Sequence, residues 1–415
     1  MTSARPHSYQ RQGSVYVMVL ASSMILTTIG LGALFAIRVQ RRSIQMTQNM
    51  AEARLHAQSA IELGLLFVRT NPNWRSTWSN GTWISEQSLD NGTYSLTGVD
   101  PDDGDLADSE YDPLVLTGVG ACGIARHQTQ VTLVPDIMPL EALNTCIHTS
   151  GLLKITVGHL IRAIGAPVST NGMLDNDEII DGDAEADSID TMKTITGTLT
   201  VPAAQKTMPD PNVISDYISK ATVVPFTGNI DKQVLTPTYN PWGSTNADGV
   251  YFIDTGDHDI LIQKFRLQGT LIVRLGTKKL TLDREVLMQN YRSDYPVLII
   301  DGDMELKIDS YSATLSEVVD SRNYNPPGAP YQGQSDSDLT DEYPNEVQGL
   351  VHVTGFLKLN NTARVKGAII CEGSVECANK NTIIHNPSLY AIPPEGYTYV
   401  AGMKVSPESY QQVVD

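Results

Sequence analysis

The chain has 415 residues, of which 41% are apolar and 18% are charged, and its formal net charge is −18. This length is enough for two or three domains, and the composition excludes a disordered or collagen-like chain. The net acidity argues against a general nucleic-acid binder, which needs a basic surface.

The charge is divided unevenly along the chain. Residues 1–75 contain eight arginines and two glutamates, whereas residues 76–415 contain 21 basic and 45 acidic side chains. The first part therefore has a net charge of +6 and the remainder has −24. Two physically different pieces are joined in this chain.

The first predicted element is a transmembrane helix. Residues 14–37 contain no charged side chain. At about 1.5 Å per residue the run is about 36 Å long, enough to cross a hydrocarbon layer of about 30 Å. A cleaved secretory signal is the alternative, but its apolar core is shorter and ends at a small-residue site, whereas Arg38, Arg41 and Arg42 follow this run. Both flanks are basic and do not fix the orientation; we expect the N-terminus inside.

The helical pattern continues beyond the predicted span. Apolar and small residues recur at steps of three and four from Met46 to Val68, which is typical of a helix with one apolar face. The first strong stop signal is Asn71-Pro72. The sequence therefore predicts one helix over residues 14–70, about 85 Å long. Its first half suits lipid, and its second half suits packing on a globular head.

The N-terminal part resembles type IV pilin-like proteins. A basic leader ends at Gly13, the uncharged run follows, and an alanine- and glutamate-rich stretch continues from Ala51 to Gly64. That stretch is most similar to PilX-type minor pilins and to the K-type pseudopilins of type II secretion. The resemblance implies that a prepilin peptidase removes the leader, residues 1–13, by cutting between Gly13 and Ser14.

The same resemblance implies a function and partners. The chain would be a minor pilin-like or pseudopilin-like subunit of a type IV pilus or a type II secretion-type filament, in contact with other pilin-like subunits. It would span the cytoplasmic (inner) membrane once, with its large C-terminal part in the periplasm or at the cell surface. Small residues of the span would contact neighbouring helices; these are Ala21, Ser22, Gly30, Gly32 and Ala33.

The chain departs from the pilin pattern at one position. Major pilins have a glutamate at the fifth mature position, where this chain has Met18. A carboxylate in lipid is costly unless it is paired, and in pilins it pairs with a neighbour's terminal amine. Its absence is compatible with a minor or tip subunit, which does not stack repeatedly.

The next predicted region, residues 71–136, is a small pilin-like β region that packs on the second half of the long helix. Strand-like runs occur at residues 93–96, 114–117 and 129–134. The acidic turn from Asp100 to Asp105 is expected to be a solvated loop, with calcium binding as the alternative.

Residues 137–390 are predicted to form a large β-rich domain. Short β-branched runs alternate with glycine and polar corners, and over residues 349–385 the strands start every six to nine residues. The pattern favours a right-handed parallel β-helix, and a β-sandwich is the alternative. A proline-rich, acidic insertion at 324–345 is expected to be a surface excursion, and residues 391–415 a C-terminal tail. The fold class is α+β, mainly β.

Motifs of catalysis are missing from the sequence. It contains no H-E-x-x-H, phosphate loop, dinucleotide fingerprint or G-x-S-x-G. Clustered carboxylates could act as acid and base, but their glycine-rich setting is typical of polar turns; the side chains weighed are Asp254, Asp257, His258, Asp259, Asp301 and Asp303. We therefore expect no enzyme, cofactor, metal or nucleic-acid partner. The alternative function is a membrane-anchored carbohydrate-active or carbohydrate-binding β-helix.

The chain contains four cysteines, an even number that permits disulfides in an exported body. Cys371 and Cys377 flank a short segment, and we expect them to form a disulfide across a corner. The pairing of Cys122 and Cys146 stays open.

Overall fold

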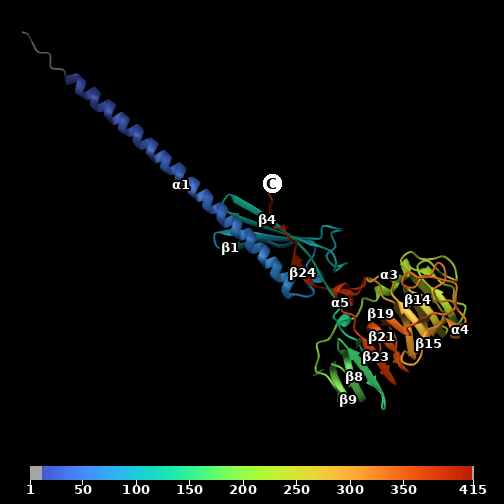
Figure 1. The fold of residues 1–415 in the computed structure, drawn as a ribbon. Helices are drawn as coiled ribbons and strands as arrows, with labels where there is room; N and C mark the ends of the chain where they lie inside the picture. Colours follow the sequence, from blue (N-terminus) through green and yellow to red (C-terminus); the bar gives the residue numbers. More distant parts are fainter. Residues whose placement is uncertain (1–11, 414–415) are drawn as a thin grey trace, which may run out of the picture. The chain divides into compact units, whose positions relative to one another are not determined.

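The structure is a computed structural model that describes residues 12–413 (Figure 1). It divides into two compact units. The first contains the chain up to Asp136 and the residues from Val400 onward, and the second contains Ile137–Tyr399. The second unit is thus inserted between two segments of the first. Residues 1–11 of the predicted leader lie outside the described residues.

The first unit is built on α1 (Gln12–Thr70), one continuous helix as the sequence predicts. It ends just before Asn71-Pro72 because proline disfavours helical backbone in the residue that precedes it. A short helix, α2 (Trp74–Thr77), follows. The strands of this unit are β1 (Gly81–Leu89), β2 (Gly92–Val99), β3 (Leu114–Cys122), β4 (Ala125–Pro139), β24 (Thr398–Val405) and β25 (Gln411–Val413).

These strands form one sheet against the second half of α1. Its order is β1-β2-β3-β4-β24, with β25 also paired to β4, and the four N-terminal strands are antiparallel to their neighbours. Buried residues alternate along β3, so that one face of the sheet lies on the helix. The small β region predicted for 71–136 is therefore present, and it is completed by residues from the other end of the chain.

The expectation of a C-terminal tail over 391–415 needs correction. Residues 388–391 form α5 (Ser388–Ala391), and β24 and β25 then join the sheet of the first unit. Sequence pattern does not reveal these strands because both are mostly exposed or half-buried. They consequently lack the alternation of apolar and polar residues that marks a half-buried strand.

The second unit is a solenoid of stacked parallel strands. Each strand pairs in parallel with the strand of the next coil, for example β15 with β16 and β21 with β23. This confirms the predicted β-helix-like fold and rules out the β-sandwich. Its strands are β5 (Ile147–Thr149), β6 (Leu153–Ile155), β7 (Leu160–Ile164), β8 (Val168–Asp181), β9 (Ala184–Ile195), β10 (Leu199–Thr200), β11 (Thr222–Val223), β12 (Ile230–Leu235), β13 (Val250–Asp254), β14 (Ile260–Gln268), β15 (Thr270–Gln289), β16 (Leu298–Ile308), β19 (Glu346–Val353), β20 (Leu357–Leu359), β21 (Arg364–Cys371), β22 (Val375–Cys377) and β23 (Lys380–Ile384).

The coils are not stacked in chain order. The coil of β5–β7 lies between β8 on one side and the last coil, β21–β23, on the other. The chain therefore starts in the middle, builds one end through β8–β10, and crosses to the other end at β11 and β12. It then returns coil by coil to its start. The backbone N–H of Leu140 donates to the carbonyl of Tyr397 at 3.1 Å, which ties the two ends of this unit together.

A column of glycines brings successive coils together at one corner. A Cβ on Gly373 would lie 2.3 Å from the carbonyl oxygen of Gly355, and one on Gly355 would lie 2.7 Å from that of Gly302. Gly151 repeats the contact with Gly373 at 2.7 Å. Since no real Cβ fits at such distances, the corner requires glycine in each coil.

The remaining elements cover the outside of the solenoid. The 3-10 helix η1 (Glu141–Asn144), α3 (Asn212–Lys220) and α5 bury apolar side chains on its outer face, among them Tyr217 against Phe252 and Ile272. The predicted acidic insertion leaves the solenoid between β16 and β19 with β17 (Leu315–Ser316), α4 (Glu317–Asp320) and β18 (Glu342–Tyr343). Its Tyr324 and Tyr343 lie in a small separate apolar cluster that also contains Val234 of β12 and Leu287 of β15.

Candidate functional site

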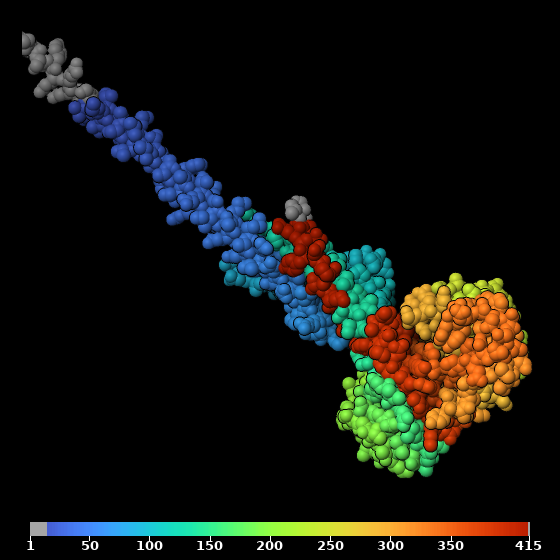
Figure 2. Space-filling view, in the orientation of Figure 1, coloured from blue at the N-terminus to red at the C-terminus, as the bar shows by residue number. Residues whose placement is uncertain are grey.

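The first half of α1 is the most unusual surface of the first unit. Val15, Leu26 and Phe35 are each more than 60% exposed, and none of the most apolar stretch of the helix is buried (Figure 2). Within the described residues, α1 is the one helix long and apolar enough to cross a membrane. A continuous exposed apolar surface of this length needs lipid or other apolar helices around it.

The polar side chains of this half are satisfied within the helix itself. The hydroxyl of Ser22 donates to the carbonyl of Val19 at 3.0 Å, and Ser23, Thr27 and Thr28 donate in the same way to carbonyls three or four residues earlier. In a medium without water such bonds keep these four hydroxyls paired. The serines and threonines therefore do not conflict with insertion into lipid.

The five small residues expected to contact other helices lie in this exposed part. Ala21 and Gly32 are eleven residues apart, as are Ser22 and Ala33, so each pair shares one helix face at a distance of three turns. No other part of the described chain comes within 4 Å of a Cβ built on Gly30 or Gly32. Their contact with other helices stays a prediction.

The second half of α1 approaches the sheet more closely than ordinary side chains allow. A Cβ on Gly120 of β3 would lie 2.0 Å from the carbonyl oxygen of Ala53, and one on Gly118 would lie 2.4 Å from that of Ala57. Ala53, Ala57 and Ala60 are fully buried. Small residues on both sides thus let the helix backbone rest on the strand.

Two residues of the predicted apolar face remain outside this contact. Met46 and Met50 are about half exposed, and with Leu55 they line a shallow groove beside His127 and β25. The predicted face is therefore confirmed from Ala53 onward, where the sheet begins to cover it.

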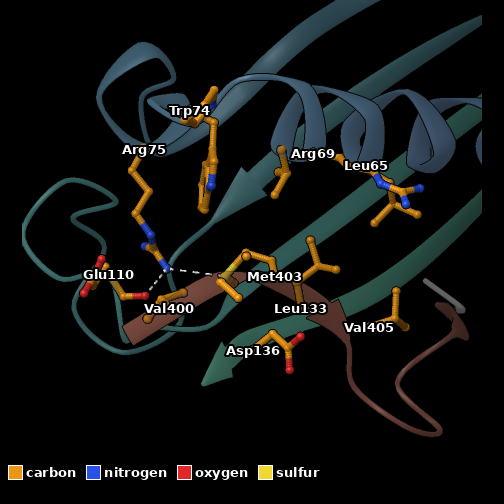
Figure 3. A pocket seen from close by; sticks show the side chains of 14 residues that line it. Leu65, Arg69, Trp74, Arg75, Glu110, Leu133, Asp136, Val400, Met403 and Val405 are labelled. Carbon is orange, nitrogen blue, oxygen red and sulfur yellow. Dashed lines mark hydrogen bonds between the residues drawn. The ribbon is translucent and has the colours of Figure 1, made fainter. Parts of the chain in front are cut away.

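A hollow of about 690 Å³ lies at the end of α1 within the first unit (Figure 3). The Arg75 guanidinium stacks on the Trp74 ring, 4.6 Å from its centroid, and donates to the carbonyls of Leu106 and Glu110 at 3.3 and 3.4 Å. Lys404 of β24 pairs with Asp136 at 2.8 Å. These contacts engage Arg75 and Asp136 in holding the loop and β24.

The carboxylates weighed as catalytic groups lie in the corners of the solenoid. Asp257 Oδ1 accepts the N–H of Thr277 at 2.9 Å, Asp259 that of Lys279 at 3.0 Å, and Asp303 that of Phe356 at 2.7 Å. The Thr277 N–H and hydroxyl hold the pKa of Asp257 below its usual value. The remaining members behave similarly: Asp254 accepts the N–H of Gly256, Asp301 accepts from Arg274, and His258 bonds the carbonyl of Thr255. The bonds of Asp257, Asp259, Asp301 and Asp303 join neighbouring coils, and those of Asp254 and His258 lie within one turn, as is usual for polar turns.

The structure brings together a histidine, a glutamate and a tyrosine that sequence spacing does not connect. His352 Nε2 lies 2.9 Å from Glu372 Oε1, and Nδ1 lies 3.0 Å from the Tyr397 hydroxyl. His352 and Tyr397 are fully buried. Coil stacking places residues about twenty positions apart side by side, which no local motif reveals. The network links β19 to the end of the unit, and its glutamate is about a third exposed.

The expected disulfide between Cys371 and Cys377 is not formed in the structure. Both are free thiols inside the solenoid. The chain turns a corner between them, so that Cys371 lies beside Val353 and Cys377 beside Leu359 in the neighbouring coil. Cys371 Sγ contacts the carbonyl of Gly355 at 3.2 Å, and burial raises the pKa of this thiol to about 12. These cysteines therefore act as core residues. Cys122 and Cys146 are also free.

Comparisons with known proteins give only distant structural likenesses. No family model matches the chain, and no curated protein does. The competence-associated pilin ComZ from Thermus thermophilus aligns with 88% of this chain and 98% of its own, at 10% identity and a TM-score of 0.24. The ice-binding protein LeIBP from Arctic yeast covers 58% of this chain and 90% of its own, at 11% identity and a TM-score of 0.27.

A third solved structure is similar to the same extent. The ice-binding protein of the Antarctic ascomycete Antarctomyces psychrotrophicus covers 60% of this chain and 99% of its own, at 8% identity and a TM-score of 0.27. At these values none of the three likenesses assigns the chain to a family or an activity.

Proposed function

We propose that the chain is a pilin-like structural subunit, anchored in the cytoplasmic membrane by the first half of α1, with its second unit presented outside that membrane. The observation that supports this most directly is the single helix with two different surroundings. Its first half is apolar and exposed, and its second half is seated on an antiparallel sheet through alanine and glycine contacts. A membrane anchor and the framework of a globular head are thus one element.

The same geometry supports other pilin-like subunits as partners. The exposed half of α1 can leave the bilayer only if other helices replace the lipid around it, and small residues allow close helix contact. Met18 is 75% exposed and offers no carboxylate for a neighbour's terminal amine. We therefore propose incorporation in low copy number, at or near the end of a pilus or secretion-type filament.

Processing by a prepilin peptidase between Gly13 and Ser14 is the first test. Mass spectrometry of the membrane-extracted protein should find an N-terminus at Ser14. Replacing Gly13 with valine should block the cut and leave the span inserted. An intact Met1 or Thr2 terminus in cells with an active prepilin peptidase would contradict this part of the proposal.

Cross-linking in membranes is the second test. Photo-reactive residues at Ala21 or Gly32 should cross-link to other pilin-like subunits. Replacing Met18 with glutamate should change the amount of subunit incorporated, and Met18→Leu is the matched control that should not. Cross-links to lipid alone would contradict a role in a filament.

We also propose that the subunit has no catalytic activity of its own. The corner carboxylates are occupied by hydrogen bonds between coils, which supports a structural role. Replacing Asp301 and Asp303 with asparagine should leave incorporation unchanged. If these changes instead abolish turnover of a polysaccharide, the carbohydrate-active alternative takes precedence.

A further inference from the structure

The acidic insertion between β16 and β19 of the second unit holds three carboxylates close together. Glu317 is the first residue of α4, and Asp336 and Asp341 lie on the segment that returns toward β19. One oxygen of each lies within 4.8 Å of those of the other two. Glu317 is fully buried and the aspartates are half-buried. Three negative charges at this distance repel one another strongly unless a cation is near.

The two cations of the neighbouring strand β14 form no ion pair with these carboxylates, although the charge of Arg266 is close enough to interact with Glu317. Lys264 pairs with Asp320 rather than with Glu317. The buried Arg266 donates to the carbonyls of Tyr324, Ala329 and Pro330 at 2.6, 2.8 and 2.5 Å. The three carboxylates therefore have no ion-pair partner among these side chains.

Neutral donors also bond the three carboxylates, among them the backbone N–H of Asp341, which donates to Glu317 Oε2 at 3.3 Å. The backbone N–H of Tyr324 donates to Glu317 Oε1 at 2.6 Å. The Tyr343 hydroxyl lies 3.0 Å from Glu317 Oε1 and 3.3 Å from Asp341 Oδ2. It has one proton and can donate it to only one of them at a time. These bonds fix the carboxylates in place without cancelling their charge.

Asn325 supplies an independent sign of a ligand. Its side chain is only 2% exposed, and its Nδ2 lies 3.2 Å from Asp336 Oδ2 and 2.9 Å from Asp341 Oδ2. Its Oδ1 is buried and has no hydrogen-bond partner among the described residues. A buried amide oxygen without a partner is costly. A half-turn of the amide exchanges the two atoms and turns this oxygen toward the carboxylates.

We propose that Glu317, Asp336, Asp341 and Asn325 Oδ1 bind one calcium ion. Carboxylate and amide oxygens are the ligands that this cation prefers, and it tolerates irregular geometry better than magnesium does. The ion offsets two of the three negative charges and supplies a partner for the amide oxygen. It joins α4 to the returning segment and so fixes the insertion on the second unit. The expectation of no metal site is thereby revised for this part of the chain.

The full-length protein in detergent micelles, freed of metal with a chelator, is titrated with calcium chloride by calorimetry, and separately with magnesium chloride. We expect binding that is specific for calcium and at least about tenfold weaker in Asp341→Asn. A second acidic group in the first unit, Asp100, Asp103, Asp108 and Asp112, provides the matched control. The double variant D103N/D108N should retain the binding. If D341N leaves calcium binding unchanged, or if only D103N/D108N removes it, the proposal is wrong.

Asn325→Asp tests the site without relying on loss of binding. This change adds a fourth carboxylate at nearly constant volume and removes the two amide hydrogen bonds. Its Tm should fall below that of the unchanged protein in chelator, and calcium should raise it by more than in the unchanged protein. A purely structural asparagine gives the same deficit in Tm with and without calcium, and that result would overturn the proposal.

Discussion

The two units achieve close backbone contact with glycine in different arrangements. In the first unit, Gly118 and Gly120 of β3 contact the backbone of α1, so the unit depends on a single interface between helix and sheet. In the second, Gly302, Gly355, Gly373 and Gly151 repeat the contact from coil to coil around a continuous apolar core. The comparison teaches that a change at one contact should unfold the first unit as a whole, whereas the second should lose structure locally.

The largest effect is expected from Gly120→Val. Its side chain would overlap the helix backbone at Ala53, which cannot move without lifting α1 from the sheet. We expect a loss of about 4 kcal/mol from the first unit, above the usual range for overpacking because the clash is with backbone. Hydrogen exchange analysed by mass spectrometry should show β1–β4 unprotected and the solenoid unchanged. Ala121→Val, on the other face of β3, is the control. Equal loss of protection in both units would contradict the independence of the two.

Arg266→Met should loosen one region of the second unit. The change leaves the carbonyls of Tyr324, Ala329 and Pro330 without a donor, at a cost of about 3 kcal/mol for the insertion. Burial lowers the pKa of Arg266 to about 10, so it remains charged at neutral pH. Limited proteolysis should cut between residues 321 and 345 and leave the coils intact. Arg274→Met, at a half-exposed surface pair, should have little effect. If R266M unfolds the whole second unit, that unit unfolds as one body and does not lose structure region by region.

His148 should make the solenoid less stable in acid. Burial, and secondarily the charge of Lys206, lowers its pKa to about 4, against 6.5 in an unfolded chain. Between these values the unfolded state binds the proton and the folded state does not, so stability falls as pH decreases from 6.5 to 4. The expected loss approaches about 3 kcal/mol.

The test is denaturant unfolding of the second unit at several pH values. His148→Gln should flatten this pH dependence, and the exposed His258→Gln should not. A slope unchanged by His148→Gln would assign the acid sensitivity to other groups.

The smallest effect is expected from Asp257→Asn at one solenoid corner. The carboxylate accepts from the N–H and the hydroxyl of Thr277, and its pKa is lowered for that reason. This stabilisation is present above the ordinary pKa of the carboxyl group and disappears as pH falls through the lowered value. The variant should therefore melt slightly lower than the unchanged protein at neutral pH and equally in acid. A difference that persists in acid would show that the shape of the side chain matters rather than its charge.

The sequence was sufficient for the elements whose signal is local. The long helix, its end before Pro72 and the stacked strands with glycine corners follow from apolar runs and turn residues. The sequence could not show that the second unit is inserted between two segments of the first. The strands that return to the first unit, β24 and β25, are largely exposed and carry no regular pattern. The His352 network depends on which coils are neighbours, and the cluster of Glu317, Asp336 and Asp341 depends on how the acidic insertion folds back on itself. Neither arrangement follows from local sequence. The disulfide prediction failed because spacing along the chain does not show that a corner separates Cys371 from Cys377.

The bond between Leu140 and Tyr397 has a consequence for synthesis. The chain emerges from its N-terminus, so β1–β4 are made early, and the two strands that complete their sheet are the last described elements to appear. The solenoid between them closes on its own ends and can fold as one body while the first unit still lacks its edge. Truncation of the last residues should therefore leave a folded solenoid attached to an unfinished sheet, with an open strand edge at β4 that is prone to aggregation.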